Sequence, residues 1–165
     1  MRDPVDNHAT EMTKTSREQV ALAVLRVAVG AMFVWVFFEN LGKGAYTPSG
    51  YKGVIDYYVK TGHAPAVWKG VISAMADNAR IVAPLQAATE LGFGVLLLAG
   101  AATRVVAAAA GTFLFSLWVT ELGTSWIWEL GMPVVVAFSL AWARAGRTFG
   151  VDALIARRFP GWRLG

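Results

Sequence analysis

Residues 86–104 read QAATELGFGVLLLAGAATR, and this stretch decides the fold class. Its apolar length approaches the roughly 20 residues of a transmembrane helix, yet Glu90 lies inside it. Gly100 and the basic Arg104 end it in a short turn, and a second apolar run follows at once. The stretch therefore predicts a membrane helix that carries an acid and is joined by a tight turn to the next helix.

The composition of the whole chain agrees with a membrane protein. The chain has 165 residues, of which 56% are hydrophobic and 16% are charged, whereas soluble domains have about 25% charged residues. Its mean hydropathy is +0.48. The apolar residues fall in blocks of about 20, which a soluble core of this size cannot bury. We therefore expect one integral membrane domain.

Three features of the composition exclude other classes. The chain has no cysteine, which excludes disulfides, thiol redox centres and iron–sulfur sites. Its pI is about 9.7, but its basic residues are not interleaved with aromatic ones on a polar face, so we expect no nucleic-acid partner. His8 and His63 lie outside the apolar runs, so we expect neither a bis-histidine haem nor a metal site.

Four apolar runs within residues 19–145 predict four transmembrane helices. They cover about residues 19–40, 80–102, 104–122 and 126–143. The short second and third links predict an all-α, antiparallel four-helix bundle. Residues 1–18 are polar, and we expect a separate tail there, with Thr15 or Ser16 as the N-cap of the first helix.

Two segments outside the helices suit the membrane surface. Residues 42–78 form the one long loop. Within it, residues 54–60 and 66–76 are amphipathic, and tyrosine and tryptophan residues lie in or near these two segments. Such rings favour the headgroup layer, so we expect an interfacial segment on the outer side. The tail at residues 146–165 is basic and amphipathic, and its Trp162 is typical of a helix on the bilayer surface.

The basic residues predict the orientation. Nine lysines and arginines fall on the side shared by both termini and Arg104, and five fall on the other side. The positive-inside tendency then places both termini in the cytoplasm, with the chain in the plasma (inner) membrane. Small-residue faces such as AAAAG at residues 107–111 allow close packing, including that of a homo-oligomer.

Several motifs resemble one known family. ELGFGVLLLAGAATR at residues 90–104 and RAGRTFGVD at residues 144–152, with LRVAVG at 25–30 and NLGK at 40–43, are similar to the DoxX/DoxD family of small four-helix membrane proteins. The long first loop and SWIWEL at residues 125–130 resemble the DoxD branch, which includes a membrane subunit of thiosulfate:quinone oxidoreductase. The resemblance covers about residues 20–155. It implies a link to quinones or membrane redox complexes, and no mechanism.

Two charges lie inside predicted spans, Arg26 and Glu90. Each would cost about 2.5–3.5 kcal/mol unpaired in mid-membrane. Their distances from the inner helix ends, about 10 Å and 16 Å at 1.5 Å per residue, are close enough for the arginine to bridge. We therefore predict an Arg26–Glu90 pair, which either fixes the register of two helices or takes part in chemistry.

Residues around that predicted pair suggest a ligand site. A polar strip on the second helix faces an aromatic strip on the first, and together these could line a site for a flat quinone head group or a lipid tail. The candidate lining residues are Gln86, Gly30, Phe33, Phe37 and Gly94. No covalently bound cofactor is expected, and a quinone is one ligand that this site could hold.

A second candidate site lies at the outer rim. Carboxylates there could relay protons released by quinol oxidation or bind a cation, or they could simply face water and headgroups. The rim candidates are Glu39, Lys43, Glu121, Trp128 and Glu129.

Two functions remain open from the sequence. The first is a membrane subunit of a quinone-linked oxidoreductase, DoxD-like and of the thiosulfate:quinone kind, which provides an anchor or a quinone site beside a second subunit. The alternative is a non-enzymatic scaffold or small-solute permease on the same bundle. The first function would make the chain a catalytic or non-catalytic part of an enzyme complex, whereas the alternative involves no enzyme.

Overall fold

The computed structural model describes residues 4–143, 145–147 and 149–159, and within them the chain is all-helical. The helices are α1 (Pro4–Gly42), α2 (Pro48–Thr61), α3 (Ala66–Asp77), α4 (Ala79–Ala99), α5 (Thr103–Thr120), α6 (Ile127–Ala143), the short 3-10 helix η1 (Ala145–Arg147) and α7 (Val151–Arg158). The predicted second, third and fourth helices coincide with α4, α5 and α6 to within three residues at each end.

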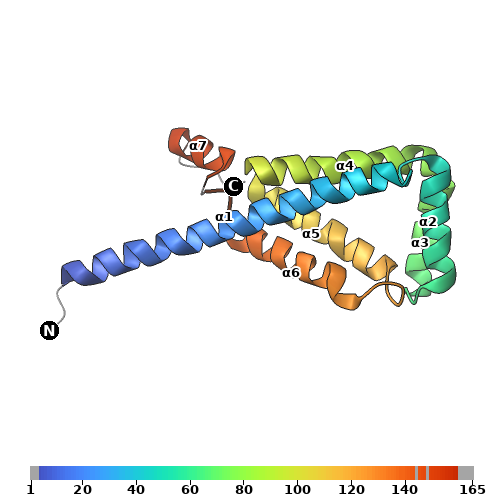
Figure 1. Ribbon diagram of the computed structural model, residues 1–165, viewed down its shortest axis with the longest axis horizontal. Coiled ribbons are helices and arrows are strands. Elements are labelled where there is room, and N and C mark those ends of the chain that lie inside the picture. The colour runs from blue at the N-terminus through green and yellow to red at the C-terminus, as the bar shows by residue number, and fades with distance from the viewer. Residues whose placement is uncertain (1–3, 144, 148, 160–165) are drawn as a thin grey trace.

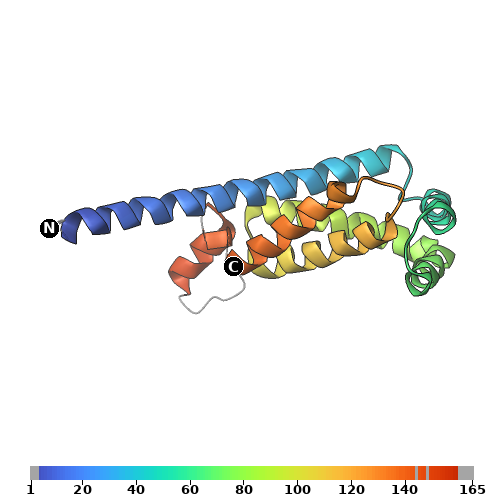
Figure 2. The ribbon, with the colours of Figure 1, turned by 90° about the horizontal axis from the view of Figure 1, so that it is seen from below.

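Four helices pack beside one another. α1 packs against α4 and α6, and α5 packs against the same two helices. We call α1, α4, α5 and α6 the helical body. Figures 1 and 2 show α2 and α3 running across one end of it, which we call the hairpin end. The α4–α5 turn, η1 and α7 lie at the opposite end, which we call the turn end.

The expectation of a separate polar tail at residues 1–18 is wrong for the described part of that segment. α1 begins at Pro4 and continues without a break to Gly42, so neither Thr15 nor Ser16 is its N-cap. Proline suits the first helical position, and no glycine or proline interrupts residues 5–29. Figure 1 shows the first part of α1 extending well past the turn end of the helical body.

Three helices of the described residues are long and apolar enough to cross a membrane. They are Arg17–Gly42 within α1, Ala79–Ala99 and Thr103–Thr120. α6 is also apolar but has 17 residues. The large exposed hydrophobic side chains on these helices, such as Trp35 and Trp142, are what a surface in contact with lipid requires.

The contact between α1 and α4 is close because both helices place glycine there. A Cβ on Gly30 would lie 2.9 Å from the backbone nitrogen of Leu98, and one on Gly94 would lie 3.1 Å from the backbone nitrogen of Val34. Backbones that approach this closely leave little freedom for one helix to slide along the other. The glycine pair therefore sets which residues of α1 and α4 lie at the same level.

The hairpin of α2 and α3 packs on the first part of α4 through its own small core. That core contains Tyr51, Ile55, Ile72, Ala76, Ala79 and Ala83. Trp68 on α3 donates from Nε1 to Thr120 Oγ1 at 2.9 Å, which joins the hairpin to the end of α5. The amphipathic segments predicted at residues 54–60 and 66–76 thus lie in α2 and α3.

Candidate functional site

The two charges predicted to pair lie at opposite ends of the helical body. Arg26 and Glu90 are both buried, each 1% exposed. Arg26 donates to the backbone oxygens of Ala145 and Phe149, both at 2.9 Å, at the turn end. Glu90 is bonded by Asn40, near the hairpin end of α1. Fourteen residues separate Arg26 from Asn40, which is about 20 Å along a helix, so the predicted Arg26–Glu90 pair is wrong.

The register of α1 on α4 explains this correction. Gly30 contacts Gly94 and Leu98, and Arg26 lies one turn before Gly30 on α1. This contact therefore places Arg26 level with Gly100 rather than with Glu90. Depths counted from the predicted inner helix ends missed this offset, because α1 begins long before the level of Gly100, where α4 ends, and Arg26 lies at that level. Tertiary contact between small residues, and not charge attraction, determines where each charge lies.

Glu90 is the centre of a polar cluster that we call the Glu90 site. Gln86 donates from Nε2 to Glu90 Oε1 at 2.9 Å, and Asn40 donates from Nδ2 to Oε2 at 3.3 Å. The hydroxyl of Tyr46 donates to the same Oε2. The Phe37 ring stacks on Tyr46 with centroids 5.5 Å apart. A buried carboxylate thus meets three neutral donors beside an aromatic ring.

Local sequence explains how Tyr46 reaches Glu90. α1 ends at Gly42, and Gly44 has a φ of +71°, a left-handed conformation that favours glycine. The chain therefore turns back on itself, and Ala45 N–H donates to the backbone oxygen of Asn40 at 2.9 Å. Tyr46 follows directly. Burial and then the hydrogen bond to Glu90 raise the pKa of Tyr46, so its phenol keeps its proton and remains a donor.

The predicted ligand-lining residues separate into two groups. Gln86 and Phe37 belong to the Glu90 site. Gly30 and Gly94 lie in the close helix contact, where added side-chain atoms meet backbone, so they serve packing and cannot face a quinone ring. Phe33 is 2% exposed and its ring lies 5.5 Å from that of Phe93 within the core. The flat site predicted along both glycines is therefore wrong, and what remains of it lies at the hairpin end.

The predicted outer-rim set also divides. Glu39 and Lys43 form an exposed ion pair of 2.6 Å one turn apart on α1. Glu121 instead interacts with Ser125 and Tyr58, and electrostatically with Glu129. The rim acids thus form two groups, one exposed on α1 and one around Glu121. Trp128, at the start of α6, is 54% exposed.

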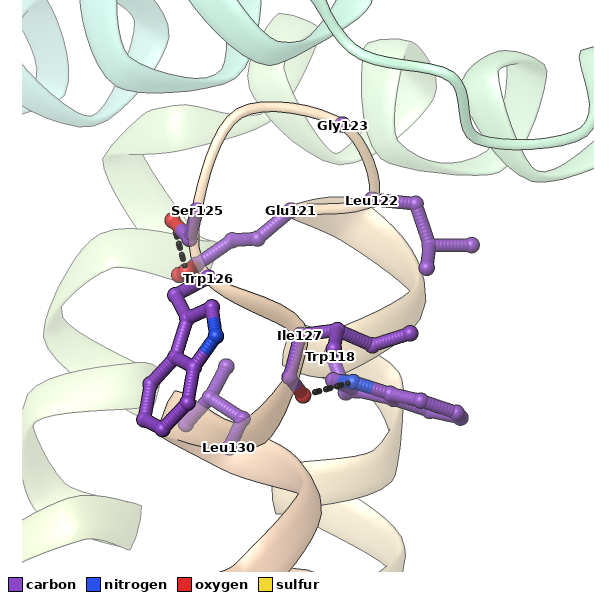
Figure 3. A pocket seen from close by; sticks show the side chains of 8 residues that line it. All are labelled: Trp118, Glu121, Leu122, Gly123, Ser125, Trp126, Ile127 and Leu130. Atoms are coloured by element: carbon purple, nitrogen blue, oxygen red, sulfur yellow. Dashed lines mark hydrogen bonds between the residues drawn. The ribbon is translucent and has the colours of Figure 1, made fainter.

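Glu121 borders a small cavity of about 60 Å³ beside the α5–α6 turn. Figure 3 shows Glu121 reaching toward Ser125, whose hydroxyl donates to Glu121 Oε2 at 2.8 Å, with the Trp126 ring close by. Trp118 donates to the backbone oxygen of Ile127 at 2.7 Å, which holds the turn. Burial raises the pKa of Glu121, which lies just past the end of α5, and the charge of Glu129 acts in the same direction.

A residue missed by the sequence reasoning, Asp152, organises the turn end. Its carboxylate accepts the backbone N–H groups of Ala102 and Thr103, both at 2.8 Å, and so caps the first turn of α5 from the distant α7. Its own N–H donates to the Gly100 oxygen at 2.9 Å. Asp152 is close enough to Arg26 to interact with it electrostatically. The only sequence signal was its place in the RAGRTFGVD motif.

This arrangement defines what each site can do. Within the described residues, no group of three His, Cys, Asp or Glu side chains could hold a metal ion. The Arg26–Asp152 region is closed by backbone contacts, since a Cβ on Gly100 would lie 2.7 Å from the Gly150 Cα. The Glu90 site is different, because a buried carboxylate with neutral donors can accept a ligand hydroxyl or a proton. We therefore take the Glu90 site as the candidate functional site.

Comparisons with known proteins agree with the motifs. Residues 21–121 match the model of the DoxX family, described simply as DoxX. Comparison with curated proteins and with solved structures found no match. The matched residues cover more than half of the chain and contain α2 to α5, most of the apolar part of α1 and the Glu90 site. The chain therefore belongs to the DoxX family.

Proposed function

We propose that all four helices of the helical body span the membrane, as an antiparallel four-helix bundle. α6, the shortest, is about 25 Å long at 1.5 Å per residue. Trp126 and Trp128 lie at one of its ends and Trp142 at the other, and they are 72%, 54% and 90% exposed. Tryptophans favour both membrane interfaces, so this spacing supports a spanning helix.

The positions of the basic residues support an orientation in the plasma membrane. Arg104, Arg157 and Arg158 are exposed at the turn end, and the polar start of α1 extends past that end. An excess of basic residues favours the cytoplasmic side. The turn end then faces the cytoplasm, and α2 and α3 lie in the outer interfacial layer.

The function that this geometry supports best is that of a membrane subunit in a quinone-linked oxidoreductase. DoxX proteins are linked to membrane redox proteins, and the Glu90 site is the observation that carries the proposal. The Glu90 carboxylate would accept the hydrogen bond of a quinol hydroxyl, while the amides of Gln86 and Asn40 would donate to a quinone carbonyl. The Phe37 ring offers a stacking surface.

This chain would bind and orient the quinone rather than carry electrons. The sequence has no cysteine, so it holds no thiol or iron–sulfur group that could pass electrons to the quinone. A second subunit would supply the redox centre, and thiosulfate is the substrate class suggested by the DoxD resemblance. Placed at the hairpin end, the Glu90 site would exchange the quinone's protons with the outer side.

Binding of a quinone analogue tests the proposal. Purified protein titrated calorimetrically with a short-chain benzoquinone should bind it, and Glu90→Gln should weaken binding about 10- to 100-fold, because a hydrogen bond to a charged group is lost. Glu39→Gln is the matched control, since that carboxylate is exposed at the same end of α1. If the natural protein and both variants bound the quinone with equal affinity and unfolded at the same temperature, the Glu90 site would not be the quinone site.

A non-enzymatic scaffold is the second candidate function. The close contact of Gly30 with Gly94 and the packed rings of Phe33, Phe93 and Phe113 favour it over a permease, because they fill the space between α1, α4 and α5. Uptake of a solute into proteoliposomes by the isolated chain would instead favour the permease. Co-purification of a quinone would favour the oxidoreductase subunit over both.

A further inference from the structure

α7 has one face tied to the protein and one face left exposed. Asp152 is 0% exposed and bonded to the start of α5. Leu154, by contrast, is 64% exposed, and Phe149 just before the helix is 79% exposed. Because Asp152 fixes the rotation of the helix, Leu154 cannot turn inward against the helical body. The exposed apolar face is therefore built into the fold.

Positive charge borders this apolar face. Arg157 and Arg158 are exposed in the last turn of α7, and Phe159 after them is 61% exposed. Arg104, exposed in the first turn of α5, lies at the same end of the molecule. Apolar side chains flanked by arginines are typical of helices that lie at a lipid interface.

α7 also lies at the level expected for the lipid headgroup layer. Figures 1 and 2 show it just beyond the end of α4, on the side toward which the start of α1 extends. The apolar spans of α4 and α5 meet here, at the Gly100–Ala102 turn. A face at this level meets the headgroup layer and not the hydrocarbon centre.

We propose that α7 docks the turn end onto anionic lipid headgroups, with Phe149 and Leu154 inserted among the acyl chains and Arg157 and Arg158 on the headgroup phosphates. Charge complementarity selects this occupant, because each arginine near an anionic surface shifts the bound-to-free ratio about fivefold. A second copy of the chain would place the same arginines against each other. The proposal rests on the membrane location of the chain and is independent of quinone binding.

Spin labelling tests this docking directly, since the natural chain has no cysteine. Leu154→Cys carries a nitroxide, and the full chain is placed in nanodiscs of phosphatidylcholine alone or with phosphatidylglycerol. In the anionic discs we expect the label to collide more with oxygen and less with a water-soluble nickel chelate. Arg157→Gln with Arg158→Gln should remove that difference between the two lipids.

A label at Ala156→Cys is the matched control. This residue lies on the opposite side of α7 from Leu154 and is half-buried, so its exposure to nickel should be the same in both lipids. Equal nickel exposure of the Leu154 label in both lipids would overturn the proposal. So would spin–spin broadening that appears only with two copies per disc, because it would show that a second chain covers the face.

Discussion

At the scale of single residues, the two buried charges are each satisfied near their own end of the helical body. Arg26 bonds two backbone oxygens at the turn end, and Glu90 accepts from three neutral side chains toward the hairpin end. An unpaired charge costs most at mid-membrane and less near the interfaces. Local partners toward either end therefore remove the need for a pair across the helical body.

Asp152 carries the first prediction at this scale. Asp152→Asn replaces one of two acceptor oxygens with an NH₂ group that would face the N–H of Ala102 or Thr103. We expect a loss of about 1.5–3 kcal/mol in the free energy of unfolding, because a buried donor loses a charged acceptor. Denaturant unfolding in detergent, followed by circular dichroism, measures it.

The control for this prediction is Asp56→Asn. Asp56 forms a long, exposed ion pair of 3.8 Å with Lys52, so its loss should cost about 0.5 kcal/mol or less. Equal effects of the two substitutions would mean that Asp152 does not cap α5 in solution.

At the scale of helices, glycine determines how α1 and α4 fit together. Gly30→Ala places a Cβ 2.9 Å from the Leu98 backbone nitrogen. Backbone cannot move aside cheaply, so we expect a loss of about 1–3 kcal/mol in unfolding free energy. The same unfolding measurement checks this value.

Gly92 on α4 provides a control of opposite sign. A Cβ at Gly92 would meet no atom within 4 Å, so Gly92→Ala should stabilise the protein by about 0.5–1 kcal/mol through helix propensity alone. If both alanines acted in the same direction, the close contact of α1 with α4 would not determine the register.

At the scale of the whole molecule, the arginines of the turn end predict the topology. A reporter that is active only in the cytoplasm should be active when fused after Gly165, and inactive when inserted between α2 and α3 next to His63. The converse pattern would show that the turn end faces outward. It would also place the Glu90 site on the cytoplasmic side.

The helices themselves could be predicted from the sequence because each depends on local pattern. Apolar runs of about 20 residues must form helices in lipid, and Gly100 and Gly123 lie close to their ends. Residues 54–60 and 66–76 were predicted only as amphipathic pieces of a long loop, whereas the structure has two helices there, α2 from Pro48 and α3 from Ala66. The sequence did not predict that α1 begins at Pro4. The polar residues before residue 19 were taken to lie outside the helix, whereas they lie only outside its apolar part.

The candidate site was only partly predictable. Glu90, Gln86 and Phe37 were recognised by residue type and position, whereas Asn40, Tyr46 and Asp152 were not linked to a buried charge. Tyr46 reaches Glu90 through a turn at Gly44, and Asp152 reaches α5 across 49 positions of sequence. Neither contact leaves a periodic signal.

The sequence by itself determined that this protein is helical, belongs in a membrane and carries two buried charges. Those properties follow from composition and local pattern, since lipid requires every backbone group to bond within its own helix. Only the tertiary structure decided which residues the charges meet. The Gly30–Gly94 contact offsets α1 along α4, so Glu90 meets Tyr46 and Asn40 while Arg26 lies beside the Asp152 cap.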